Sequence, residues 1–146
     1  MRLFHTLFLY IHIVSAVGSI GPLFSLIPII KRMESADTEQ LSGLVQSFQS
    51  AIIVIKHAGH VLVVSGIILI ITSGWTWTTS WIVLTIAIMV GSIVFLARAF
   101  KPTLKTFGTQ EFNKELFIKK LRKATWQYIL ILLIMLWLMV AKPALW

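Results

Sequence analysis

The residues of this chain best suited to chemistry are its four histidines, all of which lie within the first 60 of its 146 residues. His5 and His12 share one long apolar stretch, and His57 and His60 lie three residues apart in the next. An ionisable side chain inside a membrane is costly, so by default it points to function. Imidazole nitrogens bind haem iron and also copper and zinc. The histidines therefore indicate a haem or metal site.

A b-type haem site with His12 and His60 as axial ligands is the leading interpretation. Counted along two antiparallel helices, the two imidazoles fall within about one turn of the same depth. Haem needs one imidazole on each face and small residues where its ring meets the backbone. The other residues expected to contact the haem are Ser15, Ser19, Gly59 and Lys56, the last as a partner for a propionate. The expected role is electron transfer, haem handling or redox sensing, with membrane oxidoreductase activity left open.

Two further classes of function remain open. One is a copper or zinc site, or a transporter, built from His12, His57 and His60, because histidines three apart on a helix can converge on one ion. The other is a cofactor-free membrane assembly partner, in which the histidines only pack and His5 lies at the membrane surface. The chain has no cysteine, which excludes thiolate ligands, iron–sulfur clusters and covalent c-type haem.

The elements that must position these histidines are long apolar helices. The chain is 58% hydrophobic and only 12% charged, with a mean hydropathy of +0.90, whereas soluble domains are about 25% charged. Its length fits four spans of about 20 residues. The sequence predicts one all-α transmembrane domain over 1–146, an integral membrane four-helix up-down bundle. The expected helices cover about 3–30, 44–74, 81–98 and 109–141, the last beginning from an N-cap at Thr109.

Basic residues set the expected orientation in the cell membrane. Ten Lys and Arg residues fall in the two long loops and their flanks, against only Arg2 and Lys142 on the opposite side. The positive-inside rule places both long loops in the cytoplasm and both termini outside. The net charge of +8 then reflects contacts with anionic lipid head groups, not with nucleic acid. A homodimer or a subunit of a larger membrane complex is the expected assembly.

The first apolar run contains the segment YIHIVSAVGSIGPLF, from Tyr10 to Phe24. This segment resembles a family of uncharacterised, predicted integral membrane proteins of bacteria. The later positions that share the resemblance are Lys56, Gly59, Ser65, Gly66 and Trp81.

A more distant resemblance rests on a histidine early in the first helix, followed by a step that contains glycine. Here the pattern is His12 followed by Gly18 and Gly21. It is similar to the HemJ-type protoporphyrinogen oxidases, which bind haem, and to the CopD-like copper-resistance membrane domains. The resemblance implies a histidine-containing membrane bundle that binds haem or a metal.

Overall fold

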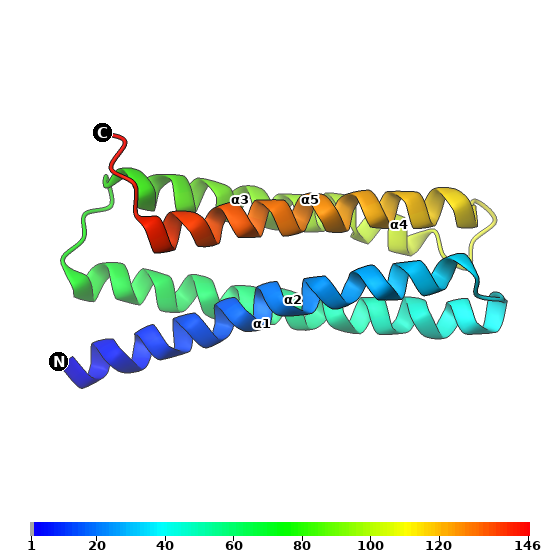
Figure 1. Ribbon diagram of the computed structural model, residues 1–146, viewed down its shortest axis with the longest axis horizontal. Helices are drawn as coiled ribbons and strands as arrows, with labels where there is room; N and C mark the ends of the chain where they lie inside the picture. The colour runs from blue at the N-terminus through cyan, green and yellow to red at the C-terminus, as the bar shows by residue number, and fades with distance from the viewer. Residues whose placement is uncertain (1) are drawn as a thin grey trace.

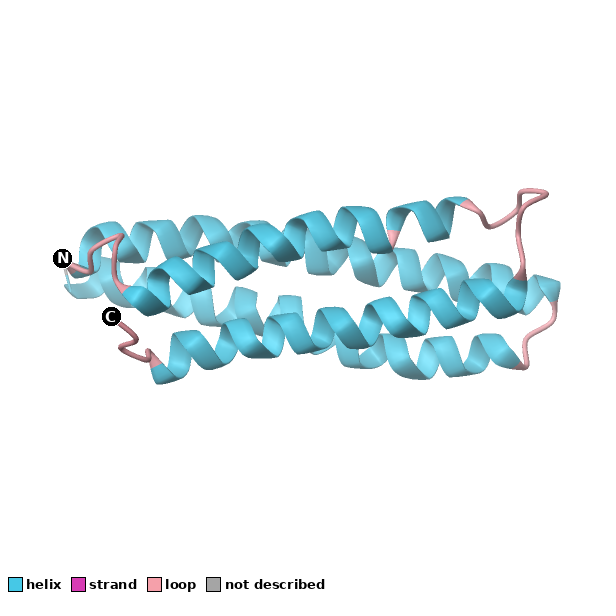
Figure 2. Cartoon of the chain, turned by 90° about the horizontal axis from the view of Figure 1, so that it is seen from above, coloured by secondary structure: helices cyan, strands magenta, loops and turns pink. Residues whose placement is uncertain are grey.

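The computed structural model describes residues 2–146, and this part of the chain is built from helices joined by short loops (Figure 2). The helices are α1 (Arg2–Glu34), α2 (Thr38–Ser73), α3 (Ser80–Ala99), α4 (Lys101–Lys105) and α5 (Lys114–Ala141). Four helical stretches are long and apolar enough to cross a membrane: α1, α2, α3 continued by α4, and α5. The predictions of an all-α fold and of four membrane-length helices are confirmed.

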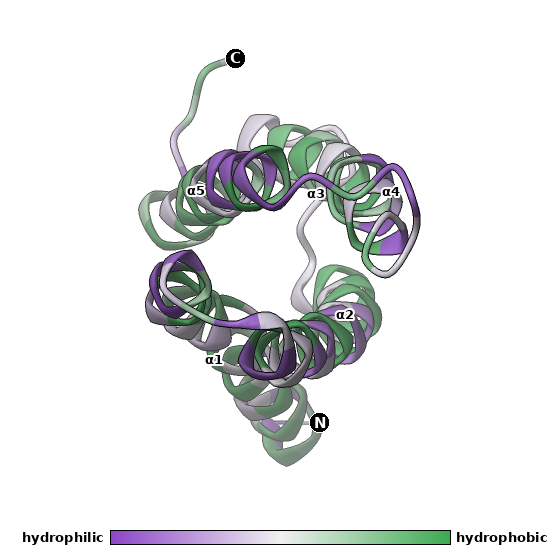
Figure 3. Cartoon of the chain, turned by 90° about the vertical axis from the view of Figure 1, so that its right-hand side faces the viewer, coloured by the Kyte–Doolittle hydropathy of each residue, from purple (hydrophilic) through white to green (hydrophobic). Residues whose placement is uncertain are grey.

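The long helices run up and down beside one another, and both chain ends lie at the same end of the bundle (Figure 1). The α1–α2 loop and the segment joining α4 to α5 lie at the opposite end (Figure 1). Helix α1 packs on α2, α3 packs on α5, and α1 also packs on α5. Viewed along the bundle, α1 and α2 form one pair and α3 and α5 the other (Figure 3). The two long loops therefore share one end, as their charge pattern predicts.

Helix α2 begins six residues earlier than the expected start at residue 44, because a capping box fixes its first turn. The Asp37 side chain accepts a hydrogen bond from the Gln40 backbone N–H at 2.8 Å, and the Gln40 side chain accepts one from the Asp37 N–H at 3.2 Å. These reciprocal bonds satisfy amide donors that a helix start leaves free. At the other end Gly74 adopts a left-handed φ of 80°, which stops the helix. Helix α1 likewise extends beyond residue 30, to Glu34.

The expected start of the last helix at Thr109 is wrong. Gly108 turns the chain with a left-handed φ of 82°, and the Thr109 hydroxyl donates to the Thr106 carbonyl in that turn. The N-cap is Asn113, whose side chain accepts a hydrogen bond from the Leu116 N–H at 3.3 Å. The short helix α4 adds one turn between residues 98 and 109, where the sequence predicts a loop. The expected 81–98 helix agrees with α3 to within one residue at each end.

The shared core lies toward the long-loop end of the bundle. Within α1 the first buried residue is Ser15, and the preceding residues from Arg2 are exposed or half-buried. Four aromatic rings join α2 to α3 and α5; this aromatic cluster consists of Phe48, Phe95, Phe100 and Tyr128. The pairs of helices are therefore tied together most firmly where the loops are long and basic.

Polar contacts close the same end. The Lys114 ammonium donates to the Ala36 carbonyl at 2.7 Å and to the Glu34 carbonyl at 3.3 Å. Arg122 forms an ion pair with the Glu34 carboxylate, and both side chains are about half exposed. An exposed ion pair adds only about 0–1 kcal/mol. These contacts therefore hold α5 beside the α1–α2 loop, while the apolar core supplies the stability.

Candidate functional site

His12 lies in the interface between α1 and α2 and has a polar partner there. Its Nδ1 lies 3.0 Å from the Ser65 hydroxyl oxygen. That hydroxyl also lies within hydrogen-bond distance of two carbonyls of its own helix, Val61 O at 2.7 Å and Leu62 O at 3.1 Å. His12 Nδ1 and the Ser65 hydroxyl therefore share a hydrogen bond between α1 and α2, and the tautomer of the imidazole decides which of them is the donor.

Small residues fix the register between α1 and α2. A Cβ built on Gly66 would lie 3.0 Å from His12 Cε1, and one built on Gly18 would lie 3.4 Å from Ala58 Cβ. His12 is therefore level with Ser65 and Gly66. His60 lies five residues before Ser65 on α2, about 7.5 Å away along the helix axis, and its side chain is exposed. The structure brings His12 together with Ser65 and does not bring it together with His60.

The haem site with His12 and His60 as axial ligands stays a prediction. In this register the two helices approach each other closely at His12 and Gly66 and again at Gly18 and Ala58. An axial pair also needs imidazoles that face each other across the ring. The exposed His60 ring lies off the α1–α2 contact that holds His12.

The small residues expected around the haem lie in contacts within α1 and between α1 and α2. The Ser15 hydroxyl donates to the His12 carbonyl at 2.9 Å, within the same helix. A Cβ built on Gly59 would lie 3.9 Å from the Ser19 hydroxyl oxygen, and Ser19 is buried. Small residues let membrane helices approach closely. Lys56 lies apart from this contact and is exposed on α2.

Among the histidines of residues 2–146, His57 and His60 are the pair whose rings lie next to each other. Both side chains are exposed on α2, and their ring centroids lie 6.2 Å apart with the planes at 81°. Two imidazoles bound tetrahedrally to one ion at metal–nitrogen distances of about 2 Å have centroids about 5 Å apart. The observed centroid distance is about 1 Å wider than in that geometry. No group of three or more His, Asp or Glu residues suited to a metal is found within residues 2–146.

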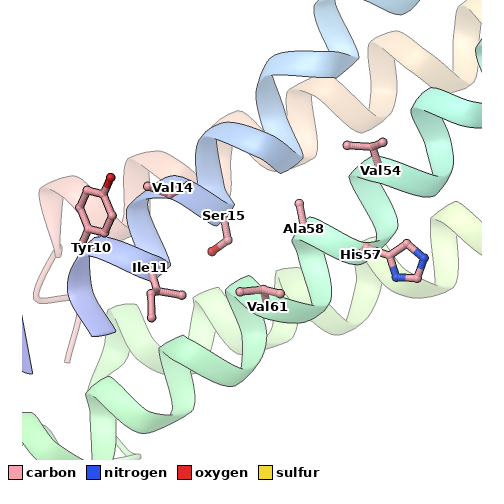
Figure 4. Close-up of a pocket in the computed structure, with 8 residues that line it drawn as sticks. All are labelled: Tyr10, Ile11, Val14, Ser15, Val54, His57, Ala58 and Val61. Carbon is pink, nitrogen blue, oxygen red and sulfur yellow. The ribbon is translucent and has the colours of Figure 1, made fainter. Parts of the chain in front are cut away.

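His57 also borders a shallow groove of about 480 Å³ between α1 and α2 (Figure 4). The groove is apolar, with Ile11 and Val14 on one side and Val54 and Val61 on the other. Figure 4 shows the His57 ring turned away from α1, toward the outer surface of α2. The imidazole is therefore reachable from the surface of the bundle, whereas that of His12 is half-buried.

We predict that Gly66→Ala destabilises the fold by about 1–2 kcal/mol, because its Cβ overpacks against a His12 ring held in place by Ser65. Thermal unfolding in detergent, followed by circular dichroism, measures the change. Gly91→Ala is the matched control, since a Cβ there meets no atom within 4 Å, and it should leave stability equal or slightly higher. Equal losses from both substitutions would contradict the α1–α2 register.

Ser65 is a hydrogen-bond partner of His12 that the sequence analysis did not predict. A serine in an apolar helix ordinarily bonds back to its own helix, as Ser65 does to Val61. Only the register of α1 against α2 shows that its hydroxyl also hydrogen-bonds with His12.

Comparison of the chain with protein-family models, with curated proteins and with solved structures finds no match. The resemblance to bacterial membrane families stays a prediction.

Proposed function

We propose that this chain is a multi-pass integral membrane protein that binds a copper or zinc ion through His57 and His60 of α2. The observation that carries the proposal is the pair of adjacent, exposed imidazoles, 6.2 Å apart, on a helix apolar enough to span a membrane. Imidazole is a preferred ligand of both copper and zinc. His12 is the less suitable ligand, because its ring is fixed in the α1–α2 contact.

The depth of the pair supports a functional role. In the α1–α2 register, Lys31 at the basic end of α1 lies level with about residue 46 of α2. His57 and His60 are then about 16 and 21 Å from that level along the helix. The hydrocarbon core of a bilayer is about 30 Å thick. Both imidazoles fall inside this core, with His57 near its middle, and an exposed ionisable group there is unfavourable unless it has a partner.

A metal ion suits this pair better than haem does. His57 and His60 project from one helix three residues apart and can approach one ion from the same side. Axial haem ligands must instead approach the iron from opposite faces. The copper or zinc alternative therefore takes precedence over the haem interpretation.

Metal analysis of the detergent-purified protein tests the proposal. Protein from cells supplied with both metals is expected to retain copper or zinc. The double variant His57→Ala/His60→Ala is expected to retain less than about a tenth as much metal, because both ligands are gone. His5→Ala is the control, since His5 lies at the far end of α1, and it should keep its metal.

An absorption spectrum recorded before and after dithionite separates metal from haem. The proposal expects no Soret band. A Soret band that shifts on reduction, or a metal content unchanged in the double variant, would overturn it.

A further inference from the structure

We infer that a second copy of this chain packs against the outer face of α2 and completes the metal site with its own His57 and His60. The inference rests on the proposed function for the metal, but the interface stands on separate observations: the pattern and the chemistry of the exposed residues of α2.

The outer face of α2 carries a continuous row of exposed side chains spaced alternately four and three residues apart. This α2 row consists of Gln46, Ser50, Ile53, His57, His60, Val64, Ile67 and Ile71. Alternating steps of four and three are the spacing at which two parallel helices pack along a common seam. Membrane helices commonly pair with this left-handed geometry.

The chemistry of the α2 row distinguishes it from the other outward surfaces of the bundle. The outward surfaces of the other long helices carry large apolar side chains, among them Val17 of α1, Val90 and Ile93 of α3, and Leu130 and Ile134 of α5. Such surfaces suit lipid. The α2 row has two imidazoles at the corresponding depth. Lipid offers them no hydrogen-bond or metal partner, whereas another polar helix face does.

Symmetry makes a second copy the fitting occupant. Two copies inserted in the same direction are related by a twofold axis along the membrane normal, which makes their interface self-complementary. Their α2 helices then run parallel, so each residue of the row meets its own counterpart. His57 meets the other His57, and His60 meets the other His60, in two layers about 4.5 Å apart.

The four imidazoles would supply the ligands that one chain lacks. Each chain offers two adjacent histidines, and residues 2–146 contain no group of three or more ligands suited to a metal. Copper and zinc sites of this kind are closed by four ligands, commonly in tetrahedral geometry for zinc. Lys56 precedes His57, is exposed and lies beside the α2 row, outside its alternating spacing.

Crosslinking of single-cysteine variants in native membranes tests the interface, since the chain has no cysteine of its own. Ile53→Cys lies on the α2 row and Val54→Cys lies off it, although the native side chains are equally exposed, at 54% and 53%. A short bis-maleimide is expected to crosslink the first into dimers many-fold more than the second. The reagent avoids copper-based oxidants, which would occupy the histidines. Equal crosslinking, or none at either position, would overturn the interface.

Metal stoichiometry of the same purified protein separates the interface from the proposed function. The inference expects about one ion per two chains, as four-coordinate ligation requires, and loss of that ion in the double histidine variant. One ion per chain in a monomer would overturn the second copy and leave the proposed function standing. Row-specific dimers that hold no metal would overturn the metal site in both forms.

Discussion

Phe48→Ala is expected to lower the free energy of unfolding by about 3–5 kcal/mol, the range for truncating a buried phenylalanine. Phe48 is fully buried, and its ring centroid lies 5.9 Å from that of Phe100. Phe100 in turn packs edge-on against Tyr128 of α5 at 6.0 Å. Removing the Phe48 ring leaves a cavity at the point where α2 meets the α3–α5 pair. The fixed helices around it cannot readily collapse into that space.

Unfolding in detergent, followed by circular dichroism, measures this loss. Phe4→Ala is the matched control, because Phe4 is a phenylalanine of α1 that is 48% exposed. Its truncation is expected to change stability by less than about 1 kcal/mol. Similar losses at both positions would contradict a core concentrated at the long-loop end. A larger loss at Phe4 would mean that the exposed beginning of α1 is buried against something else.

The number of long helices and their antiparallel order were predictable from the hydropathy pattern and the lengths of the connections. Long apolar runs separated by basic loops specify membrane-length helices, and short connections make neighbouring helices antiparallel. The helix ends were less predictable, since they depend on single side chains. Asp37 with Gln40 begins α2 early, and Gly108 delays α5 until Asn113.

The histidine site was predictable only where it is local. The i, i+3 spacing of His57 and His60 implies adjacent rings on any helix, and the structure has them 6.2 Å apart. The partner of His12 depends on how far α1 slides along α2. Close contacts at Gly18 and Gly66 set that register. The spacing of residues within either helix does not predict it.

Both ends of the chain are expected to lie on the outer side of the cell membrane, with the two long loops in the cytoplasm. The bundle already places the N- and C-termini at one end and these loops at the other (Figure 1). Ten basic residues lie at the loop end or its flanks and two at the terminal end. An excess of this size over short loops determines which end stays in the cytoplasm.

Labelling of single cysteines with a membrane-impermeant maleimide gives an all-or-none test of this orientation. Thr78→Cys, in the exposed α2–α3 turn, is expected to react in intact cells. Gln110→Cys, in the exposed segment before α5, is expected to react only after the membrane is opened. The cysteine-free parent chain is the blank for both variants, and the opposite labelling pattern would refute the orientation.

The same experiment also determines the side from which a metal ion meets polar side chains along the α2 row. Lys31 and the basic first turns of α5 mark one membrane surface, and His57 lies about 16 Å from the level of Lys31 along α2. Toward that surface the α2 row continues through Ser50 and Gln46, whereas on the other side it continues through Val64, Ile67 and Ile71. Polar side chains stabilise a hydrated ion better than aliphatic ones do. With the long loops in the cytoplasm, access to the histidine pair is therefore expected from the cytoplasmic side.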